Sequence, residues 1–239
     1  MFSPDAAKRE DRDRIRSELE ALLRSEPQKG LIRRIVLNRL HDIENQKQIL
    51  LTLGWKHMCP PVELFLADPK LIRRTLFLVT VKHPVFWALS LHRRPYHDYF
   101  RSKKMSFSEF IRHMFIPTDR DNVGDLYYRS PLELYAAKVE GYQQLAKLGV
   151  ALELVRYEDL LDKTAEFARM LSSKYGLRRL SEVLTVPQLS TKGDERALED
   201  FRSIYKLEDV VHAVCREDYE FILAVFGAER LRWLGYSDG

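Results

Sequence analysis

Lys82 and Ser90, a lysine and a serine eight positions apart, are well placed in this sequence to bind an anion. Lys82 directly follows the apolar run Leu76–Val81, and Pro84 occupies a position typical of the first turn of a helix. Helix N-termini carry partial positive charge and unpaired N–H groups, so phosphate binds there readily. Lys82 would add a full charge and Ser90 a hydroxyl donor. The alternative is a lysine in water at a strand end and a helical serine that bonds to its own backbone.

His57 is the candidate for proton transfer. An unperturbed imidazole titrates near ~6.5, close to working pH, which suits a general base. The adjacent Lys56 could bind phosphate or sulfate oxygens. The alternatives are an ordinary half-buried histidine with a hydrogen-bond partner and a lysine on the surface. Cys59 could be a reactive thiol, although a small buried hydrophobe is the default role of a lone cysteine.

The spacing of Lys82, Pro84 and Ser90 resembles the 3′-phosphate-binding motif of the sulfotransferases, in which the basic residue is usually arginine. This family moves a sulfuryl group from 3′-phosphoadenosine-5′-phosphosulfate (PAPS) to a hydroxyl or amine acceptor. The resemblance implies that Lys82 and Ser90 hold the 3′-phosphate of this donor. A lysine gives a point charge there rather than the planar, two-pronged contact of arginine.

Two further stretches are similar to sulfotransferase motifs. Residues 55–61 (Trp-Lys-His-Met-Cys-Pro-Pro) resemble the stretch that holds the catalytic histidine, one residue shorter. The resemblance implies that His57 removes the acceptor's proton and that Lys56 supports the leaving phosphate. Lys192 and Gly193 resemble a late Lys-Gly loop that also reaches the 3′-phosphate, and a plain surface turn would explain these two residues equally well.

Residues 155–161 (Val-Arg-Tyr-Glu-Asp-Leu-Leu) resemble the family's late strand and Tyr-Glu-Asp-Leu turn. The family has this turn away from the chemistry, so the resemblance implies that Glu158 and Asp159 are structural rather than a catalytic carboxylate pair. The whole resemblance covers roughly residues 54–236, and the order and spacing of the motifs carry it together.

The phosphate loop of the family is missing from the sequence. Such a loop, for example Pro-Lys-Ser-Gly-Thr-Thr after a strand, wraps the 5′-phosphosulfate in backbone N–H groups. Residues 26–33 have Pro, Lys and Gly in order but lack the hydroxyl pair, and residues 38–45 contain no glycine. Three explanations stay open: a degenerate loop in a weak or inactive enzyme, a missing N-terminal piece, or another segment that does this work.

Two other functions compete with sulfuryl transfer. A catalytically inactive relative would bind a nucleotide or a partner protein, and the missing loop favours it. A kinase-like phosphotransferase would need a Gly-rich loop with Lys-Ser/Thr and a magnesium carboxylate after a strand, and the sequence shows neither.

The predicted elements indicate an α/β protein. Strands are expected at residues 76–81, apolar enough to be buried on both faces, and at 150–155. Helices lie between these strands, which predicts parallel strands with crossover connections. The resemblance implies three layers, with a parallel central sheet flanked by helices, of the P-loop nucleotide-kinase-like sulfotransferase type. Helices are predicted at residues 84–92, 106–114, 131–148, 164–175, 206–214 and 217–226, with a short helix or loop at 62–72 and a turn at 157–159.

The apolar face of the long helix at 131–148 is predicted to hold Leu134, Ala137, Tyr142, Leu145 and Leu148, with Val139 off this stripe. One domain is expected over residues 1–239, with a peripheral charged helix within residues 1–25.

Composition narrows the class of protein. The 239 residues are 45% hydrophobic and 31% charged, as expected for one soluble globular domain. A net charge of +4 suits an anionic cofactor and is weak support for nucleic acid. Two cysteines cannot form a disulfide framework or a metal cluster. No run approaches the roughly 20 apolar residues of a membrane span, and the charged N-terminus lacks a signal-peptide core. We expect a cytoplasmic protein. We also expect a small-molecule or glycan acceptor and no metal. The oligomeric state leaves no signal in the sequence.

Overall fold

The computed structural model describes residues 57–95, 105–118, 121–125, 127–177 and 198–237, together with Ser17 and Ala21. These residues divide between two compact units. The first unit contains the described residues up to Arg73 and those between 105 and 149, and the second contains residues 74–95 and 150–237. The expectation of one domain over the whole chain stays a prediction.

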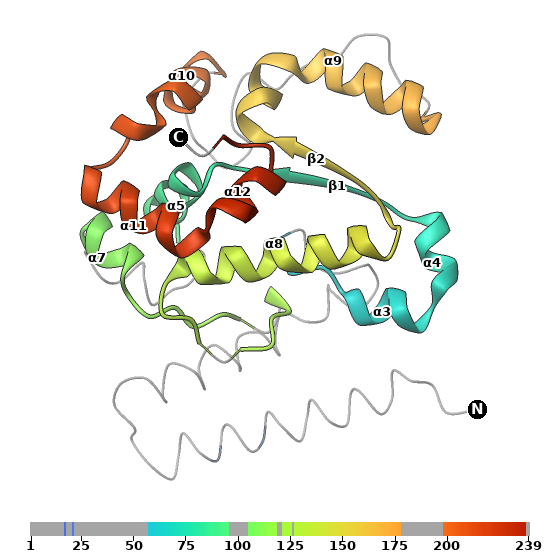
Figure 1. Ribbon diagram of the computed structural model, residues 1–239, viewed down its shortest axis with the longest axis horizontal. Helices are drawn as coiled ribbons and strands as arrows, with labels where there is room; N and C mark the ends of the chain where they lie inside the picture. Colours follow the sequence, from blue (N-terminus) through green and yellow to red (C-terminus); the bar gives the residue numbers. More distant parts are fainter. Residues whose placement is uncertain are drawn as a thin grey trace. The chain divides into compact units, whose positions relative to one another are not determined.

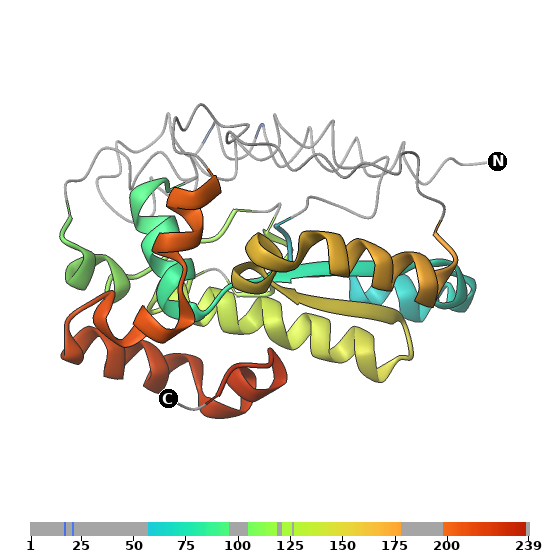
Figure 2. The same cartoon turned by 90° about the horizontal axis from the view of Figure 1, so that it is seen from above.

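Within the described residues, two parallel strands form the sheet of the second unit. The strand β1 (Leu76–Val81) pairs with β2 (Ala151–Arg156) along its whole length. The long helix α9 (Tyr157–Tyr175) follows β2 directly and runs back beside it in both views (Figure 1, Figure 2). The described chain is therefore mixed α/β with parallel strand pairing, and this level of the fold prediction is confirmed.

The burial of β1 differs from the expectation. Val79 and Val81 are buried, whereas Leu78 is 49% exposed and Thr80 is also exposed. Successive side chains of a strand point to opposite faces, so one face of β1 faces the core and the other does not. The prediction that this strand is buried on both faces is wrong.

The second unit also contains helices that follow the strands. They are α5 (Pro84–Arg93), α10 (Leu198–Ile204), the 3-10 helix η3 (Leu207–His212), α11 (Arg216–Phe226) and α12 (Ala228–Trp233). The structure confirms α5 and α11 to within one residue at each end. It replaces the predicted α-helix at 206–214 by the shorter η3 and adds α10 and α12, which were not predicted.

The helix α9 begins earlier than expected. The predicted turn at residues 157–159 is its first turn, where Glu158 and Asp159 suit the positive end of the helix. The predicted start at Thr164 lies close to Lys163, whose backbone angles (φ −112°, ψ 24°) interrupt the helix. The apolar periodicity thus identified the second half of a kinked helix.

The first unit is built around α8 (Pro131–Lys147). Ser130 caps this helix, because its Oγ accepts a hydrogen bond from the Leu132 N–H (3.1 Å) and donates one to the Ile111 carbonyl (2.6 Å). Val139, which was predicted to lie off the apolar stripe, is also buried, so the buried surface of α8 is wider than that stripe. The unit also contains α3 (Val62–Ala67) and α7 (Phe107–Ile111), and α4 (Pro69–Arg74) precedes β1.

The apolar core of the first unit includes Phe65, Phe110, Ile111, Phe115, Leu132, Leu134, Val139 and Leu145. In the part of the chain that the structure describes, no helix is both long enough and apolar enough to cross a membrane.

Candidate functional site

The ammonium group of Lys82 is held by a hydroxyl and two aromatic rings. Its Nζ lies 3.2 Å from Ser90 Oγ, 4.1 Å from the centroid of the Tyr157 ring and 4.2 Å from that of Tyr205. Both ring distances are within the range of cation–π attraction. Burial lowers the pKa of Lys82, and the nearby Tyr205 and Glu158 partly oppose this effect.

Local structure explains why Lys82 meets Ser90. Lys82 follows the last residue of β1, and Pro84 occupies the first turn of α5. A rise of 1.5 Å per residue puts Ser90 about 9 Å along the helix from Pro84. The long side chain of Lys82 and the side chain of Ser90 together bridge this span, with Nζ 3.2 Å from Oγ. The structure therefore brings together the two residues predicted to share a phosphate.

Groups of the protein itself occupy the start of α5. The buried Glu158 carboxylate accepts a hydrogen bond from the His83 N–H (2.9 Å), and His83 Nδ1 accepts one from the Val85 N–H (3.3 Å). These N–H groups were expected to be open to an anion, and that part of the prediction is wrong. An anion beside Lys82 would therefore depend on side-chain donors.

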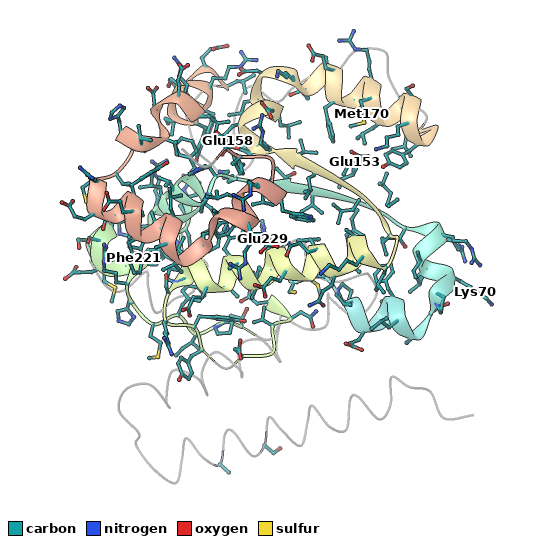
Figure 3. All side chains as sticks on the ribbon, viewed as in Figure 1. Lys70, Glu153, Glu158, Met170, Phe221 and Glu229 are labelled. Atoms are coloured by element: carbon teal, nitrogen blue, oxygen red, sulfur yellow. The ribbon has the colours of Figure 1, made fainter. Side chains whose placement is uncertain are left out.

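The two acidic residues after β2 serve the fold, as predicted. Glu158, labelled in Figure 3 at the start of α9, also accepts a hydrogen bond from the Tyr236 hydroxyl (2.9 Å), and burial raises the pKa of its carboxyl group. Asp159 forms an ion pair with Arg156 (Nε to Oδ2, 2.5 Å). Arg156 also donates a hydrogen bond to the Gly235 carbonyl (2.7 Å). Both carboxylates thus connect the start of α9 to other parts of the second unit.

His83 should make the stability of the second unit depend on pH. Burial lowers the pKa of His83 to about 4, whereas an unfolded histidine titrates near 6.5. Between these values the unfolded state binds more protons, so stability falls as the pH falls. We expect the free energy of unfolding to drop by about 2–3 kcal/mol between pH 7 and pH 4 from this group.

The variant His83→Asn isolates this effect, because asparagine can still cap the Val85 N–H but does not titrate in this range. Urea unfolding at several pH values should give a shallower pH slope in the variant than in the wild type. Equal slopes would show that His83 is not kept neutral by the fold.

His57 belongs to the first unit and is exposed. Its backbone carbonyl accepts a hydrogen bond from Lys138 Nζ (2.7 Å). This contact of His57, the predicted base, is made by its backbone and holds the fold together. Lys56, Lys192 and Gly193, which were also predicted to bind the donor, lie outside the described residues.

Lys138, which bonds to the His57 carbonyl, also forms a buried ion pair with Asp121, with Nζ 2.5 Å from Oδ1. The other carboxylate oxygen of Asp121 accepts hydrogen bonds from the backbone N–H and the hydroxyl of Thr118, both at 2.9 Å. The Asp121 carbonyl accepts from the Cys59 N–H (2.7 Å). The pair therefore connects α8 both to Thr118 and to the segment that carries His57.

Cys59 does not have the surroundings of a reactive thiol. Its Sγ lies 3.9 Å from the Ala137 carbonyl, and a side chain at Gly141 would come within 2.4 Å of this sulfur. Burial raises the pKa of Cys59 to about 11, and the thiolate is the nucleophilic form. Cys59 is a small packing group, which agrees with its default role.

Tyr205 is the site residue that the sequence analysis missed. It follows α10, a helix that was not predicted, and lies 115 positions from Ser90. Its burial and its contact with Lys82 depend on tertiary structure. An aromatic residue in a charged stretch, with Phe201 four positions before it, gave no signal of this role.

Comparisons with protein-family models, with curated proteins and with solved structures found no match. The geometry around Lys82 is thus the basis for assigning a function. It offers an ammonium group and hydroxyl groups within hydrogen-bond distance of one another, an arrangement suited to an oxyanion.

Proposed function

We propose that this chain is a sulfotransferase-like protein of P-loop nucleotide-kinase-like fold that binds PAPS. In this proposal Lys82 and Ser90 hold the 3′-phosphate. The single observation that supports it best is the 3.2 Å contact between Lys82 Nζ and Ser90 Oγ at the end of β1. The same two residues carry the sequence resemblance, and the parallel pairing of β1 with β2 is compatible with such a fold.

The proposed reaction transfers a sulfuryl group to a hydroxyl or amine acceptor. His57 takes the proton from the acceptor, whose oxygen or nitrogen then forms a bond to sulfur. The bond from sulfur to the 5′-phosphate oxygen breaks, and adenosine 3′,5′-bisphosphate leaves with the electron pair. Lys56 would stabilise the charge on this leaving phosphate, and Lys192 and Gly193 would assist at the 3′-phosphate. Such transfers depend mainly on positioning and charge stabilisation.

Lys82→Ala is expected to weaken the binding of adenosine 3′,5′-bisphosphate tenfold or more. The reason is that a hydrogen bond to a charged group contributes about 1.5–3 kcal/mol. Isothermal titration calorimetry on the full chain measures this difference. Lys82→Arg keeps the positive charge, so its affinity for the bisphosphate should fall much less.

Lys163→Ala is the matched control, because it removes a lysine of the same unit whose side chain is 61% exposed. It should leave the affinity unchanged. A folded Lys82→Ala variant with wild-type affinity would remove Lys82 from the site.

The second candidate is a protein that binds the nucleotide but transfers nothing. The absence of a recognisable phosphate loop from the sequence favours it. Incubation of the wild type with PAPS and a panel of phenols, amines and glycans separates the two candidates. Bisphosphate binding without any sulfated product would support the second candidate and reject the first.

A further inference from the structure

A third hydrogen-bonding group lies beside Lys82 and Ser90. The Tyr205 hydroxyl is 3.1 Å from Ser90 Oγ, and Lys82 Nζ lies 4.2 Å from the centroid of the Tyr205 ring. Lys82 Nζ, Ser90 Oγ and Tyr205 Oη thus form a continuous cluster, which we name the Lys-Ser-Tyr cluster. Its members come from the end of β1, from α5 and from the residue after α10.

The packing of Tyr205 holds its hydroxyl in place. The ring is buried and meets Phe86 and Tyr157 edge-on, with centroids 5.4 Å and 5.2 Å away. Phe201 stacks parallel to it at 6.5 Å. A ring fixed on several sides presents its hydroxyl in one direction, so binding an anion there costs little conformational entropy.

The charges near the cluster are the cations Lys82 and Arg93 and the carboxylate of Glu158. Burial alone raises the pKa of Tyr205, but the charge of Lys82 and the hydrogen bonds from Ser90 and Lys82 outweigh burial and lower it. A hydroxyl with a lowered pKa is a stronger hydrogen-bond donor. Arg93, exposed on α5, lies near enough to lower the pKa of both Lys82 and Tyr205 and adds to the positive potential.

Two members of the cluster are less buried than the third. Lys82 and Ser90 are each half-buried, whereas Tyr205 is buried. Tyr205 Oη lies within hydrogen-bond distance of Ser90 Oγ, so an oxyanion that binds Ser90 also comes within reach of Tyr205.

We infer that Tyr205 is a third donor to the phosphate at this site, beside Lys82 and Ser90. This inference rests on the proposed function. A terminal phosphate monoester carries three unesterified oxygens, and each can accept from one of the three donors. In the proposed function, the phosphate bound by these three donors is the 3′-phosphate of the nucleotide.

The test compares two ligands that differ in one group, adenosine 3′,5′-bisphosphate and adenosine 5′-monophosphate. Calorimetry on the full chain gives the ratio of their affinities, which isolates the contribution of the 3′-phosphate. Tyr205→Phe keeps the ring and its contacts and removes only the hydroxyl. We expect this variant to reduce the ratio about tenfold, through weaker bisphosphate binding, with the monophosphate unaffected.

Tyr236→Phe is the matched control, because it removes another buried tyrosine hydroxyl of the same unit, the one bonded to Glu158. It should leave the ratio unchanged. Far-ultraviolet circular dichroism checks the fold of each variant. If Tyr205→Phe does not fold, nuclear magnetic resonance of the wild type replaces it: the Tyr205 ring signals should shift when the bisphosphate is added and not when the monophosphate is added, and no difference between the two ligands would overturn the inference.

The outcomes separate the two levels of the proposal. If the wild type prefers the bisphosphate and Tyr205→Phe keeps the full ratio, the role of Tyr205 is overturned while the proposed function stands. If the wild type binds both ligands equally, the 3′-phosphate site itself is rejected, and the role of Tyr205 with it. If Tyr205→Phe and Tyr236→Phe reduce the ratio of the two affinities equally, the cause is general destabilisation, and the inference is overturned.

Discussion

Replacing Lys138 by methionine should lower the free energy of unfolding by about 3–5 kcal/mol, because removing one partner of a buried ion pair leaves an uncompensated charge. The carboxylate in question is that of Asp121, which is fully buried and lies 2.5 Å from Lys138 Nζ. The substitution also removes the hydrogen bond to the His57 carbonyl. The loss should therefore appear as a lower urea midpoint with an unchanged slope.

Two further variants test this explanation. The double variant Lys138→Met with Asp121→Asn removes both charges and should recover part of the loss. Lys147→Met, at the exposed end of the same helix, should change stability by less than about 0.5 kcal/mol. A loss below about 1 kcal/mol for Lys138→Met would contradict a buried charge pair of this kind.

Glu158→Ala should destabilise the second unit by about 2–4 kcal/mol, since each buried donor left unsatisfied costs about 1–3 kcal/mol. The two donors are the His83 N–H and the Tyr236 hydroxyl, both 2.9 Å from the Glu158 carboxylate. Fluorescence of Trp87 and Trp233, which lie in this unit, can follow its unfolding.

Glu158→Gln is the companion variant, because the amide oxygen can still accept a hydrogen bond at the same position. Its free energy of unfolding should fall less than that of Glu158→Ala. Combining Tyr236→Phe with Glu158→Ala should cost less than the sum of the single losses, since both remove one hydrogen bond. Strict additivity would mean that the bond between Tyr236 and Glu158 does not contribute.

Local sequence signals were enough to predict several elements. β1 has its predicted bounds because an apolar run ends at a lysine before a proline. The helices α5 and α8 start at their predicted residues because Pro84 and Pro131 each follow a capping side chain, His83 and Ser130. These signals act within a few residues and depend little on the rest of the fold.

The errors share a different cause. The first turn of α9 was predicted as a turn because the resembling sulfotransferase motif ends in one, although charge favours Glu158 and Asp159 at a helix start. The exposure of Leu78 depends on what covers β1, which the residues of the strand do not encode. The burial of Lys138 depends on Asp121, a partner 17 positions away.

The same contrast applies to the site. The pairing of Lys82 with Ser90 follows from spacing within one strand and one helix, so the sequence could indicate it. The roles of Tyr205 and of Glu158 beside His83 depend on segments 115 and 75 positions away. No periodicity connects such distant residues, so neither partner could be predicted, although the resemblance did imply that Glu158 is structural.

The hydrogen bond between Tyr236 and Glu158 has a consequence for biosynthesis. The strand β1 pairs with residues made 75 positions later, and Glu158 accepts its hydrogen bond from Tyr236, a further 78 positions along the chain. A nascent polypeptide that has not yet reached residue 236 cannot make this contact. The segment from Arg74 to Pro95 therefore completes its contacts long after its own synthesis, and its apolar side chains lack their final partners during that time.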